Sequence, residues 1–452
     1  MKKKILFLAA SYLVLLLMGW GGTAVSAAPA IKLGRIPTGL NQAEANSGSY
    51  WPRLSGDGRY VAFCSHASNL VPNDTNKVPD TFVYDTYLGV AERVSVTNSG
   101  AEVYGWTNCE GVDISGDGRY VAFGSDTAEL DDAAGENVYN DIFLRDRQNG
   151  TLTQITHAYD GGPTNGASYD PNLSADGRHI IFRSYASNLV PNDINGVADI
   201  FGYDVQTQTI NLISVSTTDS SVNGSTWFFI AGDNVSKDGR YFVFISPATN
   251  LVEKYTNGTL NVYVHDRDAD EDGVFDEPDP AETRNEMISI NLYGMGGMGL
   301  SGVPSISQNG RYVVFSSDAA DLVAGDNNGA TDIFVRDRFT GTTEMVSLSS
   351  TGTQGTLPSM KGSISDDGRF VVMQSSAQLS TYPARPYPLI YLRDRTTGVT
   401  TLLSVSQGRP ANNGSNDPII SANGRAVVFD SIASDLVSGD TNHAVDFFLY
   451  RQ

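Results

Sequence analysis

The 452-residue chain has little cysteine, little histidine and little positive charge. It contains two cysteines and five histidines, and 30 lysines and arginines stand against 51 aspartates and glutamates. Two cysteines cannot form a disulfide-rich scaffold, so a packed core must stabilise the fold. The formal net charge of −21 disfavours nucleic acid as a partner, because an acidic surface repels phosphate. The same acidity suits divalent cations, or serves only solubility.

Long apolar runs are missing after the start of the chain. The chain begins with Lys2–Lys4, continues with an apolar run from Ile5 to Trp20, and reaches small residues at Val25–Ala27. This layout predicts a secretory signal peptide over residues 1–27. A retained membrane anchor is the alternative, although the run is short for a membrane span. We therefore expect a secreted or periplasmic protein whose mature part, residues 28–452, has no membrane span.

A single phrase occurs seven times along the mature chain. It reads LSGDGRYVAFCS from residue 54, ISGDGRYVAFGS from residue 114, and ISQNGRYVVFSS from residue 306. The serine before the turn recurs at spacings of 56 to 71 residues, at positions 55, 115, 174, 236, 307, 365 and 421. A repeat with a period of this kind indicates an array or a propeller.

Each repeat predicts four antiparallel strands. A short apolar segment ends in Ser-x-Asp/Asn-Gly, a tight turn in which glycine supplies a positive φ. The following segment, such as RYVAF, alternates and is rich in strand-forming residues. A polar loop, a third strand such as DIFVRD, an Asp-x-x-x-Gly turn and a fourth strand complete the unit. Seven such units predict an all-β protein, a seven-bladed β-propeller.

The last repeat supplies only three of its four strands. Its third strand lies at residues 446–450, near the end of the chain. Residues 31–40, IKLGRIPTGL, read as a fourth strand without a repeat of its own. We expect this segment to pair with residues 446–450, which would close the ring and leave fewer exposed strand edges.

The repeat S-x-D-G-R-Y-V-A-F-x-S, followed by D-I-F-V-x-D and T-G, resembles the WD-like β-propeller repeat of the TolB family. The resemblance covers essentially the whole mature chain. It implies an exported propeller that acts through protein contacts at the cell envelope. The chain differs from TolB in having seven repeats rather than six, and no α/β domain is found before the propeller.

The topology places the long loop between the second and third strands on the same face as the connections between blades. This face carries most of the variable sequence and is the expected binding face. An Asp-x-Asn-x3-Asp motif recurs in its loops. Its oxygen atoms suit calcium, or else bind the backbone of their own loop. The motif residues are Asp74, Asn76 and Asp80; Asp193, Asn195 and Asp199; Asp326, Asn328 and Asp332; and Asp440, Asn442 and Asp446.

Aromatic residues and both cysteines are expected on this face too. Trp51, Trp106, Tyr169 and Trp227 lie at or just before a first strand, where they could bind a sugar or a partner protein, or pack between blades. Cys64 ends a strand of blade one and Cys109 precedes the first strand of blade two. They form either a disulfide or two buried thiols.

An acidic insertion at residues 265–286 accounts for the longest spacing between repeats. Asp268, Asp270, Asp272 and Gly273 match positions 1, 3, 5 and 6 of a calcium loop. Asp276 and Asp279 fall at positions 9 and 12. The insertion predicts a calcium ion that orders the turn, and a solvated acidic loop without an ion is the alternative.

Catalytic motifs are also lacking. The chain has no Gly-x-Ser-x-Gly, His-Glu-x-x-His or Walker sequence. We therefore expect a monomeric, non-enzymatic module that binds an envelope protein or a polysaccharide. The alternative is a polysaccharide-active enzyme, a lyase or a glycosidase-like protein, which would use acidic groups and His66, His157 or His443 at the pore mouth.

Overall fold

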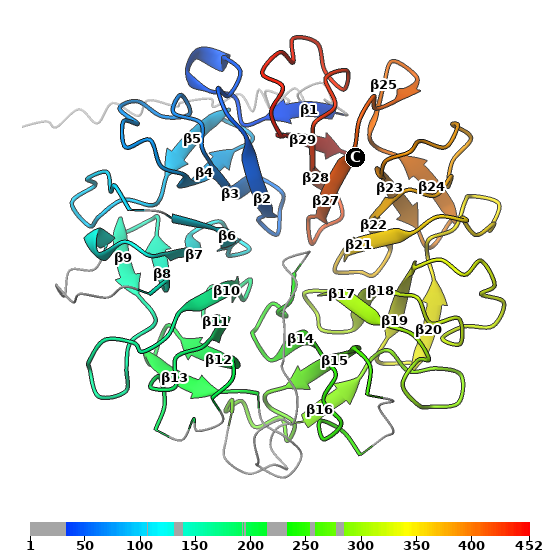
Figure 1. Cartoon of the computed structure of the whole chain (residues 1–452), viewed down its shortest axis with the longest axis horizontal. Coiled ribbons are helices and arrows are strands. Elements are labelled where there is room, and N and C mark those ends of the chain that lie inside the picture. Colours follow the sequence, from blue (N-terminus) through cyan, green and yellow to red (C-terminus); the bar gives the residue numbers. More distant parts are fainter. Residues whose placement is uncertain are drawn as a thin grey trace, which may run out of the picture.

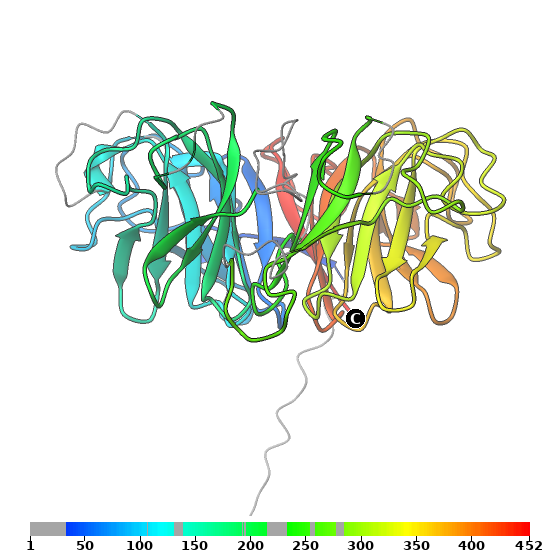
Figure 2. The ribbon, with the colours of Figure 1, turned by 90° about the horizontal axis from the view of Figure 1, so that it is seen from below.

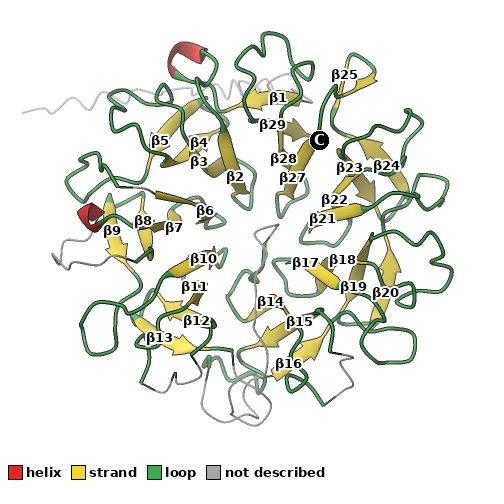
Figure 3. Ribbon diagram, in the orientation of Figure 1, coloured by secondary structure: helices red, strands yellow, loops and turns green. Residues whose placement is uncertain are grey.

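Seven sheets surround a central axis like the blades of a propeller (Figure 1). The computed structural model describes residues 33–105, 107–130, 139–191, 193, 196–214, 233–253, 258–276 and 284–452. Within these residues, Figure 3 shows strands and loops with two short 3-10 helices, η1 (Leu40–Gln42) and η2 (Ala128–Leu130). The prediction of a seven-bladed β-propeller with four-stranded antiparallel blades is confirmed.

The first three blades each contain four strands in sequence order from the axis outwards. Blade one is β2 (Ser49–Leu54), β3 (Tyr60–Ser65), β4 (Asp80–Asp85) and β5 (Val90–Arg93). Blade two is β6 (Thr107–Ile114), β7 (Tyr120–Ser125), β8 (Asp141–Asp146) and β9 (Thr151–Gln154). Blade three is β10 (Ser168–Leu173), β11 (His179–Ser184), β12 (Asp199–Asp204) and β13 (Thr209–Leu212).

Blades four to six continue the ring. In the described part of blade four the strands are β14 (Tyr241–Ser246), β15 (Asn261–Asp266) and β16 (Arg284–Met287). Blade five is β17 (Ser301–Ile306), β18 (Tyr312–Ser317), β19 (Asp332–Asp337) and β20 (Thr342–Met345). Blade six is β21 (Ser359–Ile364), β22 (Phe370–Ser375), β23 (Leu389–Asp394) and β24 (Val399–Leu402). A small hairpin of β25 (Val405–Ser406) and β26 (Arg409–Pro410) follows.

Blade seven joins the two ends of the described chain. It contains β27 (Ser415–Ile420), β28 (Ala426–Ser431) and β29 (Asp446–Arg451), and β1 (Leu33–Ile36) is its outermost strand. Strands β1 and β29 are antiparallel, with Leu33 opposite Tyr450 and Ile36 opposite Phe447. The predicted closure of the ring by residues near the start of the chain is therefore confirmed.

Every blade turns at the Ser-x-Asp/Asn-Gly sequence because the side chains satisfy the turn's own backbone. In blade one, Ser55 donates to Asp57 at 2.8 Å and accepts from the Tyr60 amide at 2.9 Å. Gly58 takes a φ of +76°, which side chains disfavour. We call the face with these turns the turn face, and the face with the long loops and blade connections the connection face. Figure 2 shows both edge-on, with the carboxyl terminus on the turn face.

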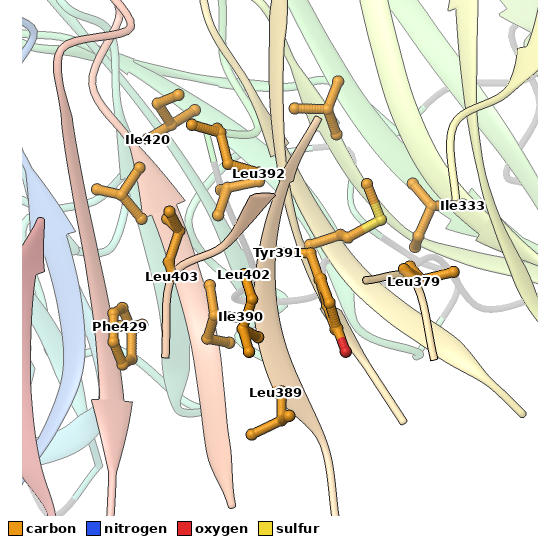
Figure 4. Packing of buried hydrophobic residues seen from close by; sticks show 14 of the residues in the cluster. Ile333, Leu379, Leu389, Ile390, Tyr391, Leu392, Leu402, Leu403, Ile420 and Phe429 are labelled. Carbon is orange, nitrogen blue, oxygen red and sulfur yellow. The ribbon is translucent and has the colours of Figure 1, made fainter. Parts of the chain in front are cut away.

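The core lies between neighbouring blades, so the central strands are buried on both sides. Phe63 of β3 and Phe82 of β4 stack with ring centroids 5.8 Å apart, and four other blades repeat this pair. Figure 4 shows buried hydrophobic residues packed between two blades, with Ile390 and Leu392 on β23 of blade six and Phe429 on blade seven. Burial of each such side chain contributes about 1.5–3 kcal/mol.

Glycine at the turns lets adjacent blades approach closely. A Cβ atom on Gly118 would lie 2.2 Å from the Tyr60 ring of the preceding blade, and Gly118 has a φ of +74°. The residue after each such glycine is an arginine, which in six blades pairs with the aspartate that ends the third strand, as Arg59 does with Asp85 at 2.7 Å. None of the helices in the described part of the chain has the length and hydropathy of a membrane span.

Candidate functional site

On the connection face, the Asp-x-Asn-x3-Asp motif of blade one ties its loop to the next connection. Asn76 donates from Nδ2 to the Asp80 carboxylate at 2.9 Å and to the Val103 carbonyl at 2.9 Å. Asp80 is 1% exposed and also accepts a hydrogen bond from Ser95 at 2.6 Å. We call this arrangement the loop clasp. In the loop clasp, the side-chain oxygen and nitrogen atoms of the motif form hydrogen bonds with other groups of the protein.

A guanidinium group occupies the centre of the loop clasp in blade one. The Nη1 atom of Arg93, on β5, lies 2.7 Å from Glu102, 3.1 Å from Asp80 and 3.4 Å from Asp74. Glu102 also accepts hydrogen bonds from the amide and hydroxyl of Thr75, each at 2.7 Å. A cation supplied by the protein therefore stands where the sequence suggested calcium.

The clasp charges have different proton affinities. Burial and the neighbouring charge of Asp80 raise the pKa of Asp74 to about 6, although Arg93 acts in the opposite direction. Burial also opposes ionisation of Glu102, but the hydrogen bonds from Thr75 and the Arg93 ion pair hold its pKa at about 2. Glu102 therefore stays charged across the physiological range, whereas Asp74 takes up a proton near pH 6.

Blade seven builds the same clasp from both ends of the chain. Asn442 donates to the Ala45 carbonyl at 3.0 Å and to Asp446 at 3.3 Å. Arg35 of β1 lies 2.5 Å from Glu44 and 3.7 Å from Asp440. The carboxylates of Glu44, Asp440 and Asp446 have oxygen atoms within 4.8 Å of one another, which is close enough for a metal ion. Arg35 already supplies positive charge beside them.

Blade five keeps the clasp but loses its charged centre. Asn328 donates to Asp332 at 2.7 Å and to the Gly355 carbonyl at 2.8 Å. Met345 is opposite Phe334 in the strand pairing, just as Arg93 is opposite Phe82. Gln354 replaces the glutamate. Burial and the charge of Asp332 raise the pKa of Asp326. Loss of the arginine and loss of the glutamate thus occur together.

The clasp of blade three lies only partly within the described residues. Asp199, at the start of β12, is 1% exposed and accepts a hydrogen bond from Ser214 at 2.5 Å. Asp193 is buried as well. Asn195, between them in sequence, lies outside the described residues. The described residues of the four predicted loop motifs belong to four separate blades and do not meet in one site.

The acidic insertion follows β15 on the turn face. One carboxylate oxygen from each of Asp268, Asp270 and Asp272 lies within 4.8 Å of the others, which brings together positions 1, 3 and 5 of the predicted calcium loop. Gly273 has a φ of +88° and donates to Asp268 at 3.3 Å. Asp276 instead accepts a hydrogen bond from Arg267 Nε at 2.9 Å. Asp279 lies outside the described residues.

Two of the four predicted aromatic residues lie within the described residues. Trp51, in β2, packs half-buried against the core between blades one and two, and Lys361 Nζ lies 5.7 Å from its ring centroid. Tyr169, in β10, meets Tyr185 edge-on at 6.3 Å, with the Arg183 guanidinium 5.6 Å from the Tyr169 ring centroid. Trp106 and Trp227 lie outside the described residues.

Near the axis, polar groups from blades six and seven converge. Lys361 of β21 forms an ion pair with Asp417 of β27, and Gln374 donates to Asn416 at 3.0 Å. Asp430 lies opposite Asn416 in the β27–β28 pairing. Burial and the charge of Asp417 raise the pKa of Asp430 to about 7, against the effect of Lys361. Strands β21 and β27 are the innermost strands of their blades (Figure 1).

The histidines do not join this group. His66 meets Tyr50 edge-on at 6.0 Å in blade one, and His157 contacts the Ile155 carbonyl at 2.8 Å in blade two. His443 lies in the loop of blade seven that carries the clasp. The cysteines of blades one and two form a disulfide, Cys64–Cys109, with Cα atoms 5.2 Å apart. An internal disulfide is compatible with an extracellular or periplasmic location.

The arrangement of blades defines the chain as a β-propeller protein, and comparisons with known proteins agree at the level of the fold. No protein-family model and no curated protein sequence matches the chain. An oligogalacturonate lyase from Vibrio parahaemolyticus has a TM-score of 0.52 at 12% identity, covering 94% of this chain and 97% of that one. The propeller domain of the Trilobed protease from Pyrococcus furiosus has a TM-score of 0.52 at 9% identity, covering 89% and 95%.

TolB from Acinetobacter baumannii is also similar to the chain, with a TM-score of 0.38 at 18% identity. The match covers 73% of this chain and 61% of that TolB. Structural neighbours thus include a TolB protein, a lyase and a protease domain. The lyase and the protease domain share the propeller fold with this chain, and at these identities none of the three assigns an activity to it.

Sequence reasoning missed the charged centre of the clasps. The signal was present, because an arginine and a glutamate nine residues apart occur as Arg93 and Glu102, and again as Arg35 and Glu44. Arg35 of the second pair lies in the segment predicted to be the missing strand, residues 31–40, and Glu44 follows that segment. The repeated spacing could therefore have identified both the closing strand and the groups that neutralise the loop carboxylates.

Proposed function

We propose that the protein is an exported binding module whose connection face holds an envelope protein or a polysaccharide. One observation carries this proposal. Among the described residues, 15 of the 21 exposed large hydrophobic side chains lie in connection-face loops or at the strand ends beside them. Apolar and aromatic groups gathered on one face of a soluble fold are typical of interaction surfaces.

The most prominent of these side chains are on the loop between blades four and five. Leu292, Tyr293 and Met298 are 59%, 79% and 85% exposed. Asp321 of blade five fixes the loop from beneath, since its carbonyl accepts from the Leu292 amide at 3.0 Å and its carboxylate accepts from the Met298 amide at 3.0 Å. A rigid loop loses little conformational entropy when a partner binds.

A pull-down from envelope extract together with a glycan array tests the proposal. The wild type is compared with a variant carrying Leu292→Ser, Tyr293→Ser and Met298→Ser. The matched control carries Tyr87→Ser and Phe339→Ser, two side chains that are 62% and 86% exposed on the turn face. We expect the first variant to lose at least tenfold in affinity and the control to bind like the wild type. Equal loss in both variants would refute the assignment to the connection face.

Calcium is a second part of the proposal. The trio Asp268, Asp270 and Asp272 supports an ion that orders the acidic insertion. Of the two carboxylate trios found among the described residues, the other, Glu44, Asp440 and Asp446, has Arg35 beside it. A ligand that binds only the folded state at 100 times its Kd stabilises the protein by about 2.7 kcal/mol. We expect calcium to raise the melting temperature relative to chelator, and Asp270→Asn with Asp272→Asn to abolish this rise. Glu271→Gln, which removes a charge in the same loop, is the control and should retain it.

A polysaccharide-active enzyme remains the second candidate. Its support is the pair Asp417 and Asp430, because the raised pKa of one carboxyl group and the lysine partner of the other are the conditions for an acid and a base at neutral pH. The oligogalacturonate lyases with this fold act on a saccharide, so polysaccharides are the substrates to test. New reducing ends or unsaturated products, lost in Asp430→Asn, would favour the enzyme. Binding without products would favour the module.

A further inference from the structure

The seam between blades three and four differs from three other seams on the turn face. At three seams, an arginine after the third strand of one blade pairs with a glutamate on the fourth strand of the blade before it. The pairs are Arg147–Glu92 at 2.7 Å, Arg338–Glu286 at 2.9 Å, and Arg395–Glu344. Between blades four and five, this pair and two further arginines line the groove. This groove therefore has strongly charged walls.

At the seam between blades three and four the glutamate is absent. Asn211 lies opposite Gly202 in the β12–β13 pairing, at the strand position that Glu92 and Glu286 occupy in their blades. Arg267 takes the arginine position, and its Nη1 donates to the Gly239 carbonyl at 3.0 Å. Its other nitrogen atoms turn to Asp276 of the acidic insertion. The cross-blade ion pair is thus replaced by a pair within blade four.

A cavity of about 320 Å³ lies at this seam. Its size is at the lower end of the range for small-molecule sites, so it fits a compound of about one ring. The insertion supplies one wall through Gly273, Val274 and Phe275, and blade three supplies the other. The lining from blade three consists of Arg178, His179, Asp204, Thr207, Thr209 and Asn211.

His179 is the buried polar group of this cavity. It is 3% exposed, and its Nδ1 atom has no hydrogen-bond partner. Its ring packs against Phe275, with centroids 4.9 Å apart, and lies so close to Gly239 that a Cβ there would be 2.6 Å from the ring. Burial and the charge of Arg267 lower the pKa of His179 to about 4, so the imidazole is neutral at pH 7. A buried polar atom without a partner is costly unless a ligand or water satisfies it.

The charges of the wall are already balanced. Arg178 pairs with Asp204 at 2.9 Å, and Arg267 pairs with Asp276. The remaining polar groups are neutral: the Thr207 and Thr209 hydroxyls, which lie 2.7 Å apart, the Asn211 amide and the His179 ring. Hydroxyl, amide and neutral imidazole groups can all take part in hydrogen bonds with alcohol groups. Phe275 and Val274 add an apolar side.

We propose that this cavity on the turn face binds a small uncharged polyhydroxyl compound, the size of a single sugar residue. His179 Nδ1 exchanges a hydrogen bond with one hydroxyl group of the ligand, and Asn211 and Thr209 bind others. A charged sugar binds more weakly, because no unpaired ion on the wall compensates its desolvation. This cavity lies on the turn face, whereas the proposed function concerns the connection face. The two proposals are therefore tested independently of each other.

The test follows the His179 ring by nuclear magnetic resonance in the whole isotope-labelled protein. Methyl α-D-glucoside, methyl α-D-galactoside and methyl N-acetyl-β-D-glucosaminide are each added to about 50 mM, well above a Kd of about 1 to 10 mM expected for so small a ligand. We expect at least one of them to move the ring signal saturably. Glucuronate, tested alongside as the charged probe, is expected to bind at least tenfold more weakly.

Two variants and a control locate the site. Asn211→Glu introduces the glutamate that three other seams have and places a carboxylate in the cavity. His179→Phe keeps the packing while removing Nδ1. We expect each to lose binding by at least tenfold, as measured by calorimetry, with an unchanged circular dichroism spectrum. Thr401→Glu, at the same strand position in blade six, should bind like the wild type. Any of three results would overturn the proposal. The first is the absence of any saturable shift, which would mean that the cavity holds water only. The others are tighter binding of glucuronate than of the uncharged sugars, and undiminished binding in Asn211→Glu.

Discussion

Removal of the clasp arginine of blade one tests how the loop carboxylates are neutralised. Arg93→Met gives blade one the residue that blade five has at Met345. The Arg93 side chain is 10% exposed, and its partners Asp80 and Asp74 have side chains that are 1% and 5% exposed. Removal of one partner from such a buried ion cluster costs about 3–5 kcal/mol. We therefore expect the free energy of unfolding to fall by about this amount at pH 8.

The loss should depend on pH and on Glu102. The pKa of Asp74, about 6 in the wild type, is above its value in the unfolded chain, so protonation of Asp74 favours the folded state and this contribution is lost as the pH rises through 6. Without Arg93 the pKa of Asp74 rises further. The variant should therefore recover part of its stability between pH 8 and pH 5. Adding Glu102→Gln, which completes the blade-five combination, should recover more.

Urea unfolding followed by circular dichroism at pH 5 and pH 8 measures both effects. Arg178→Met is the control, because Arg178 forms a similar ion pair with Asp204 but is 47% exposed, and exposed pairs contribute about 0–1 kcal/mol. The reasoning is refuted if Arg93→Met costs no more than Arg178→Met. It is also refuted if the double variant is no more stable than Arg93→Met alone.

Three further predictions concern stability. Replacing Cys64 and Cys109 by serine removes a cross-link between residues 45 apart in sequence. In the chain-entropy model this lowers the free energy of unfolding by about 4 kcal/mol, which urea unfolding can measure. A loss below about 1 kcal/mol would contradict the disulfide. Gly118→Ala should lower the free energy of unfolding by more than about 2 kcal/mol, because its Cβ would meet the Tyr60 ring. Gly150 also has a positive φ but open space around it, so Gly150→Ala should lower the free energy of unfolding by only about 1–2 kcal/mol. Asp430→Asn should raise the melting temperature at pH 8 and leave it nearly unchanged at pH 4. The reason is that the pKa of Asp430 is raised to about 7, so its ionisation destabilises the folded state as the pH rises. Equal effects at both pH values would show that the charge of Asp430 is not the cause.

The repeat made the fold predictable because each copy carries its own turn chemistry. Ser55, Asp57 and Gly58 satisfy the turn locally, so the same letters give the same turn in every blade. The closing strand was predictable for a different reason. The last repeat ends with its third strand, residues 446–450, and lacks a fourth. A strand-like segment that belongs to no repeat lies near the start of the chain. Both inferences needed only the period and the order of strands.

The candidate sites were less predictable because they depend on contacts between segments far apart in sequence. The loop motif indicated oxygen ligands, but Arg35 reaches the blade-seven carboxylates from about 400 residues away in sequence. Asp276 fitted a calcium-loop position by spacing, yet Arg267 binds it. Nothing in the spacing of His179, Asn211 and Phe275 shows that they share a seam cavity, since the substitution of asparagine for glutamate has meaning only once the blades are compared in space.

Hydrogen–deuterium exchange of blade seven tests the central claim, closure of the ring by residues near the start of the chain. The account predicts that the alternate amides of β1 that point to β29 exchange as slowly as the paired amides in the outermost strands of the other blades. Shortening the chain to begin at residue 38 should expose the β29 amides that face β1 to fast exchange. If β1 exchanges at the rate of an unpaired segment while β29 stays protected in the shortened chain, the ring is closed in some other way and the blade-seven clasp does not form.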